Sequence, residues 1–491
     1  MTPDIPGIAG QPSHGESTPP TNVPRRRRTE RIQPFNILIG IAILGALFIN
    51  IWAFGGFNTN QQNGLLLQSK GVNYRLWGSM ELLLNGKMRA IICLVFGAGM
   101  ILFLEKSDRG NKISNSDLFI RRQMWLMAFG LINALIFLWP GDILFHLGIM
   151  GILLFPFIRL SGRALLAGAM VATLIFSAKT YWNYADDRNA YSKYLAVTNF
   201  EKEISRDSLL AAQKNADAKQ VKKDSLSKQQ QTDKSTWEGL LAGKKYDPKK
   251  KEEGFKEMRS ASYSKTWNYL LPVTQAREAE WTYKTGVWDF GSMILLGMAL
   301  MKSGFFSAGF SRLKYLWLIL GGLTAGFLLG WLRLQYHQYE LQDYTRYINR
   351  RWFPADLFFP FERTFLVLGY TSLVLFMVRS GLFRSVWKVF ASVGKMPLTN
   401  YLVQSVICVL FFTGTGMGYF GRLSQFQLYL FVIEICIVQI VFSVLWMRYF
   451  YLGPAEWLLT CLMVGRWIPY KTRFPKQVQP SNVLLSCSLI L

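Results

Sequence analysis

The chain has 491 residues, of which 51% are hydrophobic and 15% aromatic, and its formal net charge is +25. Its apolar residues recur in runs near the length of roughly 20 residues that crosses about 30 Å of hydrocarbon, which excludes an ordinary soluble domain. Because Lys and Arg lie mainly in the short segments between these runs, the charge indicates a lipid bilayer as the partner and excludes nucleic acid.

The N-terminal segment 1–34 is polar and rich in Pro, Gly, Ser and Thr, and it ends in the basic cluster Arg25–Arg28 and Arg31. Such a composition cannot bury a core, so the sequence predicts a disordered tail. The basic cluster predicts that this tail stays in the cytoplasm while the first helix inserts.

Ten apolar runs predict about ten transmembrane helices, five before a long polar segment (domain 35–179) and five after it (domain 286–447). The runs cover 35–54, 86–104, 122–139, 142–160 and 163–179, and then 286–301, 313–334, 356–378, 396–418 and 427–447. Pro140 and Gly141 break the third run from the fourth, and Asp142 is placed to cap the next helix. The predicted fold is an all-α polytopic bundle.

The Lys and Arg residues of the connections predict the orientation of this bundle. With the N-terminus in the cytoplasm, the even-numbered connections are cytoplasmic, and each of them carries Lys or Arg; the short external third connection has none, and the ninth has only Arg422. The positive-inside rule therefore places both termini in the cytoplasm.

The long connection 180–285 is rich in Lys, Glu, Gln, Asp and Ser, and the same orientation places it outside the cytoplasm. Its stretch 196–242 has charges of both signs with spaced Leu and Ala, which predicts a solvated helix with a frayed middle near Lys222–Thr232. Aromatic residues at both ends of the insert, Trp281 among them, are typical of interfacial anchors.

The last segment, 448–491, is predicted to be cytoplasmic or interfacial. Within it, a short apolar stretch from Gly453 to about Trp467 is too short to span a bilayer and predicts an interfacial helix, whereas the apolar residues Val483–Leu491 support no prediction. The five Cys residues form no CxxC pair, so neither a disulfide framework nor a metal site is predicted.

Four short motifs occur at the ends of predicted helices or within them. They are Phe96-Gly97-Ala98-Gly99, Gly141-Asp142-Ile143-Leu144, the run from Gly394-Lys395-Met396-Pro397 to Gln404-Ser405, and Gly453-Pro454-Ala455-Glu456-Trp457. Together they resemble the YeiB-like family of uncharacterised bacterial inner-membrane proteins, over roughly 31–180 and 286–468. The resemblance implies a multi-pass protein of the bacterial inner membrane, with a domain of unknown function in its C-terminal half.

The YeiB-like family is similar to transmembrane acyltransferases such as the lysosomal heparan glucosaminide acetyltransferase, which move acetyl from cytoplasmic coenzyme A to a sugar on the far side. The resemblance thus implies acyl-coenzyme A as cofactor and a glycan or small-molecule acceptor. The family's first helix usually opens with Asp and then Arg-Gly, where this chain has Asn36 and then Ile39-Gly40; Asn133 stands where the family has a His, and the loop 55–85 lacks the His that the acyltransferases use. These departures weaken acyl transfer by a His base.

Polar side chains within the apolar runs are candidate functional residues, because they are expensive to place in a bilayer. Orientation assigns one set to the outer half: Asn50, Asn133, Asp142, His146, Asp289, Glu362, Arg363 and Glu434. It assigns a second set to the cytoplasmic half: Asn36, Lys395, Asn400 and Gln404. If these side chains point inward, two polar vestibules face each other across the membrane.

Asp142 and His146 are the candidate catalytic pair. Their spacing of four residues places both on one helix face, where a carboxylate can orient an imidazole as a base or a proton relay. In the alternative interpretation, Asp142 caps its helix and His146 packs nearby.

The other candidates are binding residues. Glu362 and Arg363 point about 100° apart on a helix, so each is expected to pair with another helix, and Glu434 is a candidate partner for Arg363; the alternative is a purely structural ion pair. Lys395, Asn400 and Gln404 have the chemistry to bind a phosphorylated carrier such as coenzyme A, or to form interhelical hydrogen bonds.

Three functions remain open at this point. The first is an acyltransferase-like enzyme that acts on an extracytoplasmic acceptor. The second is a proton-coupled transporter of a small solute, because intramembrane Asp, Glu and His are typical of such carriers. The third is a non-catalytic, degenerate relative whose insert is a binding element. The sequence predicts neither the substrate nor an oligomeric state.

Overall fold

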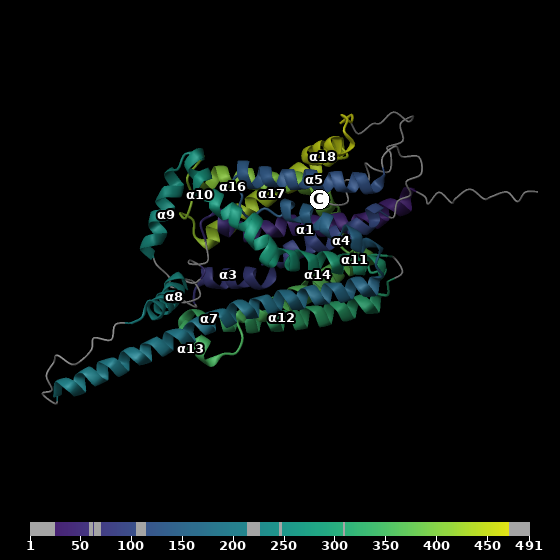
Figure 1. The fold of residues 1–491 in the computed structure, drawn as a ribbon. Helices are drawn as coiled ribbons and strands as arrows, with labels where there is room; N and C mark the ends of the chain where they lie inside the picture. The colour runs from purple at the N-terminus through teal and green to yellow at the C-terminus, as the bar shows by residue number, and fades with distance from the viewer. Residues whose placement is uncertain are drawn as a thin grey trace, which may run out of the picture.

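A computed structural model describes residues 25–57, 62, 70–104, 114–213, 226–244, 248–307 and 310–470. These residues form helices and no strand, so the predicted all-α fold is confirmed. The helices form an elongated bundle (Figure 1). Here the end of the bundle at which α8 (Lys228–Lys244), α9 (Pro248–Ser260) and α10 (Tyr263–Gln275) lie is called the insert end.

The centre of the bundle is α1 (Arg25–Phe54), α4 (Lys87–Leu104) and α11 (Val287–Lys302). Helices α4 and α11 cross in backbone contact: a Cβ at Gly97 would lie 2.0 Å from the carbonyl oxygen of Ile294, and one at Gly297 would lie 1.9 Å from that of Leu94. Small residues are typical of such close helix contacts. Gly97 and Gly297 therefore allow α4 and α11 to pack closely.

A second layer packs along this centre. It consists of α7 (Gly162–Gln213), α12 (Arg312–Gln342) and α14 (Phe359–Ser380), with the short helices α13 (Tyr344–Arg350) and η4 (Ala355–Phe358) at the insert end. Helix α12 packs along α14, and Figure 1 shows α7 continuing well beyond the bundle.

The remaining helices pack around the rest of this centre. They are α3 (Val72–Leu83), α5 (Asn115–Leu131), η1 (Ile132–Ile136), α6 (Leu144–Leu153), η2 (Phe155–Arg159), η3 (Ala276–Gly286), α15 (Arg384–Val393), α16 (Pro397–Phe412), α17 (Gln425–Tyr449) and α18 (Pro454–Val464). Helix α1 passes so close to the end of α15 that a Cβ at Gly394 would lie 1.7 Å from the carbonyl oxygen of Asn36.

Two of the sequence motifs meet where α16 and α18 begin. The Glu456 carboxylate accepts a hydrogen bond from the backbone N–H of Thr399 (3.0 Å) and another from its hydroxyl (2.5 Å), and the Ala455 N–H donates to that hydroxyl (3.0 Å). Each helix thus caps the start of the other. A Cβ at Gly453 would lie 2.2 Å from Glu456 Oε2, which explains the glycine of this motif.

Among the described residues, six helices are long and apolar enough to cross a membrane, and the α15–α16 pair, bent by 70°, gives a seventh if it counts as one span. Each of the ten predicted runs overlaps a helix, but the count of ten is not confirmed. Helices α5, α6, α11 and α16 have 17, 10, 16 and 16 residues, fewer than the roughly 20 of a straight span.

Three expected boundaries differ from the structure. Helix α1 begins at Arg25, so the basic cluster forms its first turns and is not part of a disordered tail. Helix α7 crosses the boundary predicted between residues 179 and 180, since the polar residues after 179 continue the same helix to Gln213. In the predicted frayed segment Lys222–Thr232, α8 begins at Lys228; residues 222–225, like 1–24 and Val483–Leu491, lie outside the described part of the chain.

We expect Gly97→Ala to destabilise the protein by about 1–3 kcal/mol, because the added methyl group would force the α4 and α11 backbones apart. Thermal melts of the purified protein in lipid nanodiscs measure the change. Gly321→Ala is the matched control, since nothing lies within 4 Å of its Cβ position. Equal melting temperatures for the two variants would contradict the backbone contact.

Candidate functional site

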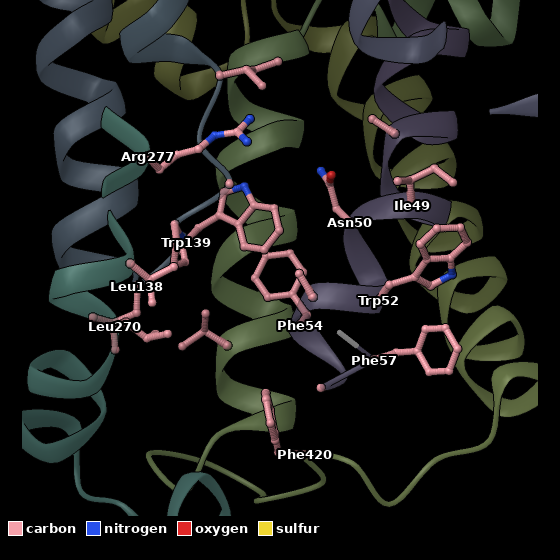
Figure 2. Close-up of a pocket in the computed structure, with 18 of the residues that line it drawn as sticks. Ile49, Asn50, Trp52, Phe54, Phe57, Leu138, Trp139, Leu270, Arg277 and Phe420 are labelled. Atoms are coloured by element: carbon pink, nitrogen blue, oxygen red, sulfur yellow. The ribbon is translucent and has the colours of Figure 1, made fainter. Parts of the chain in front are cut away.

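A cavity of about 900 Å³ lies between α1, α4, α10 and α16 and extends to α9 at the insert end. Figure 2 shows its walls, with Arg277 near one end, Phe420 at the other and the Asn50 side chain pointing between them. The cavity therefore contains one of the predicted binding residues, Asn50. It also brings together segments that are far apart in the sequence.

Most of the cavity wall is apolar, and much of it is aromatic. Phe54 stacks on Trp139 with ring centroids 3.8 Å apart, in the wall nearest Asn50. The other aromatic side chains that line the cavity are Trp52, Phe57, Phe255, Tyr269, Tyr401 and Phe420. Such a wall suits the apolar part of a ligand.

The polar groups of the wall are mostly hydrogen-bond donors. Arg89 of α4 and Arg277 of η3 both line the cavity. The Tyr401 hydroxyl accepts hydrogen bonds from Trp139 Nε1 (3.1 Å) and from the Ile143 backbone N–H (3.2 Å), so its own hydrogen is available to another acceptor. The arrangement suits an anion.

The Asp289 carboxylate forms ion pairs with two arginines beside the cavity. Asp289 of α11 accepts from Arg89 Nη2 at 2.7 Å and also forms a salt bridge with Arg363 of α14. Asp289 and Arg363 are both buried. The expected pairing of Arg363 with Glu434 is therefore wrong, because Glu434 is exposed on α17 and Asp289 takes its place.

The second carboxyl group near the arginines is Glu278 of η3, whose Oε2 lies 3.6 Å from His146 Nδ1. Burial, together with the charge of Asp142, raises the pKa of Glu278 to about 8. Burial and the neighbouring Arg89 lower the pKa of Arg277 to about 10. At neutral pH Glu278 is therefore mostly protonated, and Arg277 keeps its charge.

Asp142 and His146 do not form the expected pair. Asp142 accepts from the Asn133 side chain at 2.8 Å and from the Phe145 backbone N–H at 2.9 Å, so it caps α6 as in the alternative interpretation. The buried His146 ring stacks on Phe290 with centroids 5.3 Å apart. Neither residue lines the cavity, because both lie behind its wall.

A second buried charge network lies where α3 meets α4. Lys87 Nζ is 2.5 Å from Glu362 Oε1, and Arg333 of α12 joins Glu362 (2.7 Å) to Glu81 of α3 (3.0 Å). Lys87 and Glu362 are fully buried. Glu362 thus pairs with other helices as expected, and its partners connect α3, α4, α12 and α14 beside the residues 84–86 that line the cavity.

The predicted cytoplasmic set does not form a vestibule among the described residues. Asn400 Nδ2 donates to Ser443 Oγ at 3.1 Å, and Gln404 Nε2 donates to Gln439 Oε1 at 2.8 Å, so both amides connect α16 to α17. Lys395 is exposed, and the buried Asn36 packs against α15. None of the four lines the cavity.

The fold brings to the cavity several groups that the sequence did not single out. Arg89 lies at the start of an apolar run, where a positive charge is typical of topology, and Arg277 lies in a segment that looked solvated. The sequence feature that could have marked Arg277 as a candidate is the adjacent opposite charge of Glu278, close to the aromatic Trp281. Among the described residues, no group of three or more His, Cys, Asp and Glu has a metal-binding arrangement.

The part of the chain that the structure describes is an all-helical bundle with six or seven helices able to span a bilayer, charges buried between them and an apolar cavity. These features define a multi-pass helical membrane protein. Residues 300–466 match the family described as a protein of unknown function (DUF418). The expected resemblance to the YeiB-like family is confirmed by this match and by two relatives.

These relatives are similar over nearly their whole length. The uncharacterized protein YxaH of Bacillus subtilis (strain 168) is 26% identical over 448 residues, 90% of this chain and 96% of YxaH. The uncharacterized protein YeiB of Escherichia coli (strain K12) is 28% identical over 438 residues, 87% of this chain and 95% of YeiB. No solved structure matches the chain. Neither relative's description names an activity.

We expect Lys87→Met to destabilise the protein by about 3–5 kcal/mol, because it removes one partner of a buried ion pair and leaves Glu362 with Arg333 alone. Thermal melts in nanodiscs measure the loss. Lys284→Met is the control, because Lys284 forms an ion pair whose side chains are 70% and 62% exposed. A Lys87→Met melting temperature equal to that of the control would show that the network contributes no stability.

We expect Glu278→Gln to change how stability depends on pH. Between pH 4.5 and about 8 the Glu278 carboxyl group ionises in the unfolded chain while it stays protonated in the fold, so wild-type stability falls across this range. The fall amounts to about 2 kcal/mol after allowance for partial exposure. His146, Arg277 and Asp142 face this group in both proteins.

Melting temperatures at a series of pH values test this difference. Glu278→Gln should give a flatter curve than the wild type and should be the more stable protein at pH 8. Parallel curves for the two proteins would mean that Glu278 is ionised in the fold.

Proposed function

We propose that the protein binds a small anionic amphiphile in the cavity between α1, α4, α10 and α16, and that the ligand enters from the extracytoplasmic side. The observation that carries this proposal is the presence of Arg89 and Arg277 in a cavity of about 900 Å³ with otherwise largely aromatic and apolar walls. The loop-charge pattern supports an extracytoplasmic position for the insert end, where α9 and α10 line the cavity.

Two physical effects favour such a ligand. Two guanidinium groups in an apolar cavity lose hydration, and an anion between them restores charge-assisted hydrogen bonds. The apolar part of the ligand gains roughly 25 cal/mol for each Å² that it buries against side chains such as Phe54 and Trp139. A ligand with both parts uses the whole cavity.

Acyl transfer and transport would each act on the molecule bound in this cavity. Acyl transfer from coenzyme A also requires a donor site near Lys395, Asn400 and Gln404, and these residues lie outside the cavity wall. Proton-coupled transport is the second candidate function, because the buried Lys87–Glu362 ion pair adjoins the wall at the turn between α3 and α4. Binding has the most support of the three.

We expect Arg89→Gln and Arg277→Gln each to weaken binding of anionic octyl compounds by about tenfold or more, since each removes a charge-assisted contact. Octanoate, octyl sulfate and octyl phosphate are the probes, measured by calorimetry with the protein in nanodiscs. Lys284→Gln is the matched control, because it removes an exposed positive charge from the same helix, η3.

The uncharged octanol should bind at least tenfold more weakly than the three anions. Equal binding of octanol and the anions, or equal affinities in the arginine variants and in Lys284→Gln, would reject the proposed site. Uptake of the bound anion into proteoliposomes then distinguishes a transporter, and transfer of a labelled acyl group from coenzyme A distinguishes an enzyme.

A further inference from the structure

Trp281 of η3 contacts both arginines of the cavity. The Arg277 guanidinium carbon lies 3.9 Å from the centroid of the Trp281 ring, and that of Arg89 lies 5.7 Å from it. Arg89 also lies 5.5 Å from the centroid of the Phe290 ring. Aromatic faces attract cations and restrict them without neutralising them. One indole therefore holds two like charges near each other.

These two charges are not balanced by the carboxylates around them. Asp289 is 2.7 Å from Arg89 and is shared with Arg363. Among the described residues no carboxylate lies within 4.0 Å of Arg277, and its buried Nε has no hydrogen-bond partner. The adjacent Glu278 stays protonated at neutral pH because burial raises its pKa to about 8. An excess of positive charge remains at this end of the cavity.

Hydrogen-bond donors also outnumber acceptors here. Each guanidinium group has five N–H donors, and Arg89 donates to Asp289 through Nη2. The Tyr401 hydroxyl, which accepts two hydrogen bonds, adds a further free donor. A carboxylate offers two oxygens and one charge. A phosphate monoester offers three terminal oxygens and a charge of about −1.5 to −2, which fits two arginines better.

We propose that the ligand of this cavity is a phosphate monoester with an apolar body, whose phosphoryl group is held between Arg89 and Arg277 and whose body lies against Phe54 and Trp139. This inference rests on the proposed function and specifies its ligand class. The same phosphate chemistry occurs in lipids and in soluble metabolites, and the probes below distinguish these sources.

Trp281 is a positioning residue in this site, because it acts through the two arginines. Trp281→Leu should remove the preference for phosphate over carboxylate and retain the binding of octanoate, since the arginines keep their charge but lose their common support. Trp281→Phe keeps an aromatic face and should restore most of the preference. A purely structural role would reduce the binding of all anions equally.

Calorimetry on the full chain in nanodiscs, with matched octyl compounds at pH 7.5, tests the ligand class. Octyl phosphate should bind at least tenfold more tightly than octanoate and than octyl methyl phosphate, a diester with one charge. Inorganic phosphate should bind at least tenfold more weakly than octyl phosphate if the apolar body contributes, and equal affinity would indicate a soluble phosphate as the ligand. Arg277→Lys should reduce the phosphate preference because it removes the planar donor pair.

Equal affinities for octyl phosphate, its methyl ester and octanoate would overturn the phosphate assignment and leave the proposed anion site intact. Absence of binding by every octyl anion would overturn the proposed function and the phosphate assignment together. Loss of all binding in both Trp281 variants, with folded protein by thermal melt, would show that Trp281 supports the cavity and does not select its ligand.

Discussion

The rest of the structure depends on the close crossing of α4 and α11. Because Gly97 and Gly297 allow the two backbones to touch, Arg89 on α4 reaches Asp289 on α11, and the same carboxylate also pairs with Arg363 on α14. A larger side chain at the crossing would separate the helices that this carboxylate connects. Packing of small residues thus determines the electrostatics of the cavity wall.

Two buried charge clusters flank the cavity, and they have different consequences. In the Lys87, Glu362, Arg333 and Glu81 cluster each charge has an opposite partner at 2.5–3.0 Å, which is the arrangement that lets buried ions persist. Around Arg89 and Arg277, the Asp289 carboxylate pairs with Arg89 and Arg363, and Arg277 has no carboxylate of its own among the described residues. The first cluster connects helices, and the second leaves an excess positive charge that an anionic ligand can neutralise.

The all-helical fold with several apolar helices was predictable because it depends on the length of the apolar runs. Asn50, Asp289, Glu362 and Arg363 were identified as candidates since polar groups in apolar runs are conspicuous. The partners of these groups were not predictable, because pairing depends on which helices touch: Glu434 has the right charge and depth for Arg363, but it points away from it. The sequence suggested that Trp281 is an interfacial anchor, whereas in the fold it lies beside the arginines. This position was not predictable, because the periodicity of a sequence does not show that the insert folds back onto the bundle.

The length of helix α7 also has a structural consequence. Its 52 residues, at 1.5 Å each, make an unbroken rod about 78 Å long, of which a hydrocarbon layer of about 30 Å covers less than half. The rod packs against α11, which carries Asp289, and its far part projects beyond the bundle (Figure 1). The part of α7 beyond the bundle and the part that packs against α11 therefore belong to one continuous helix, which connects the far end of the insert to the layer beside the cavity arginines.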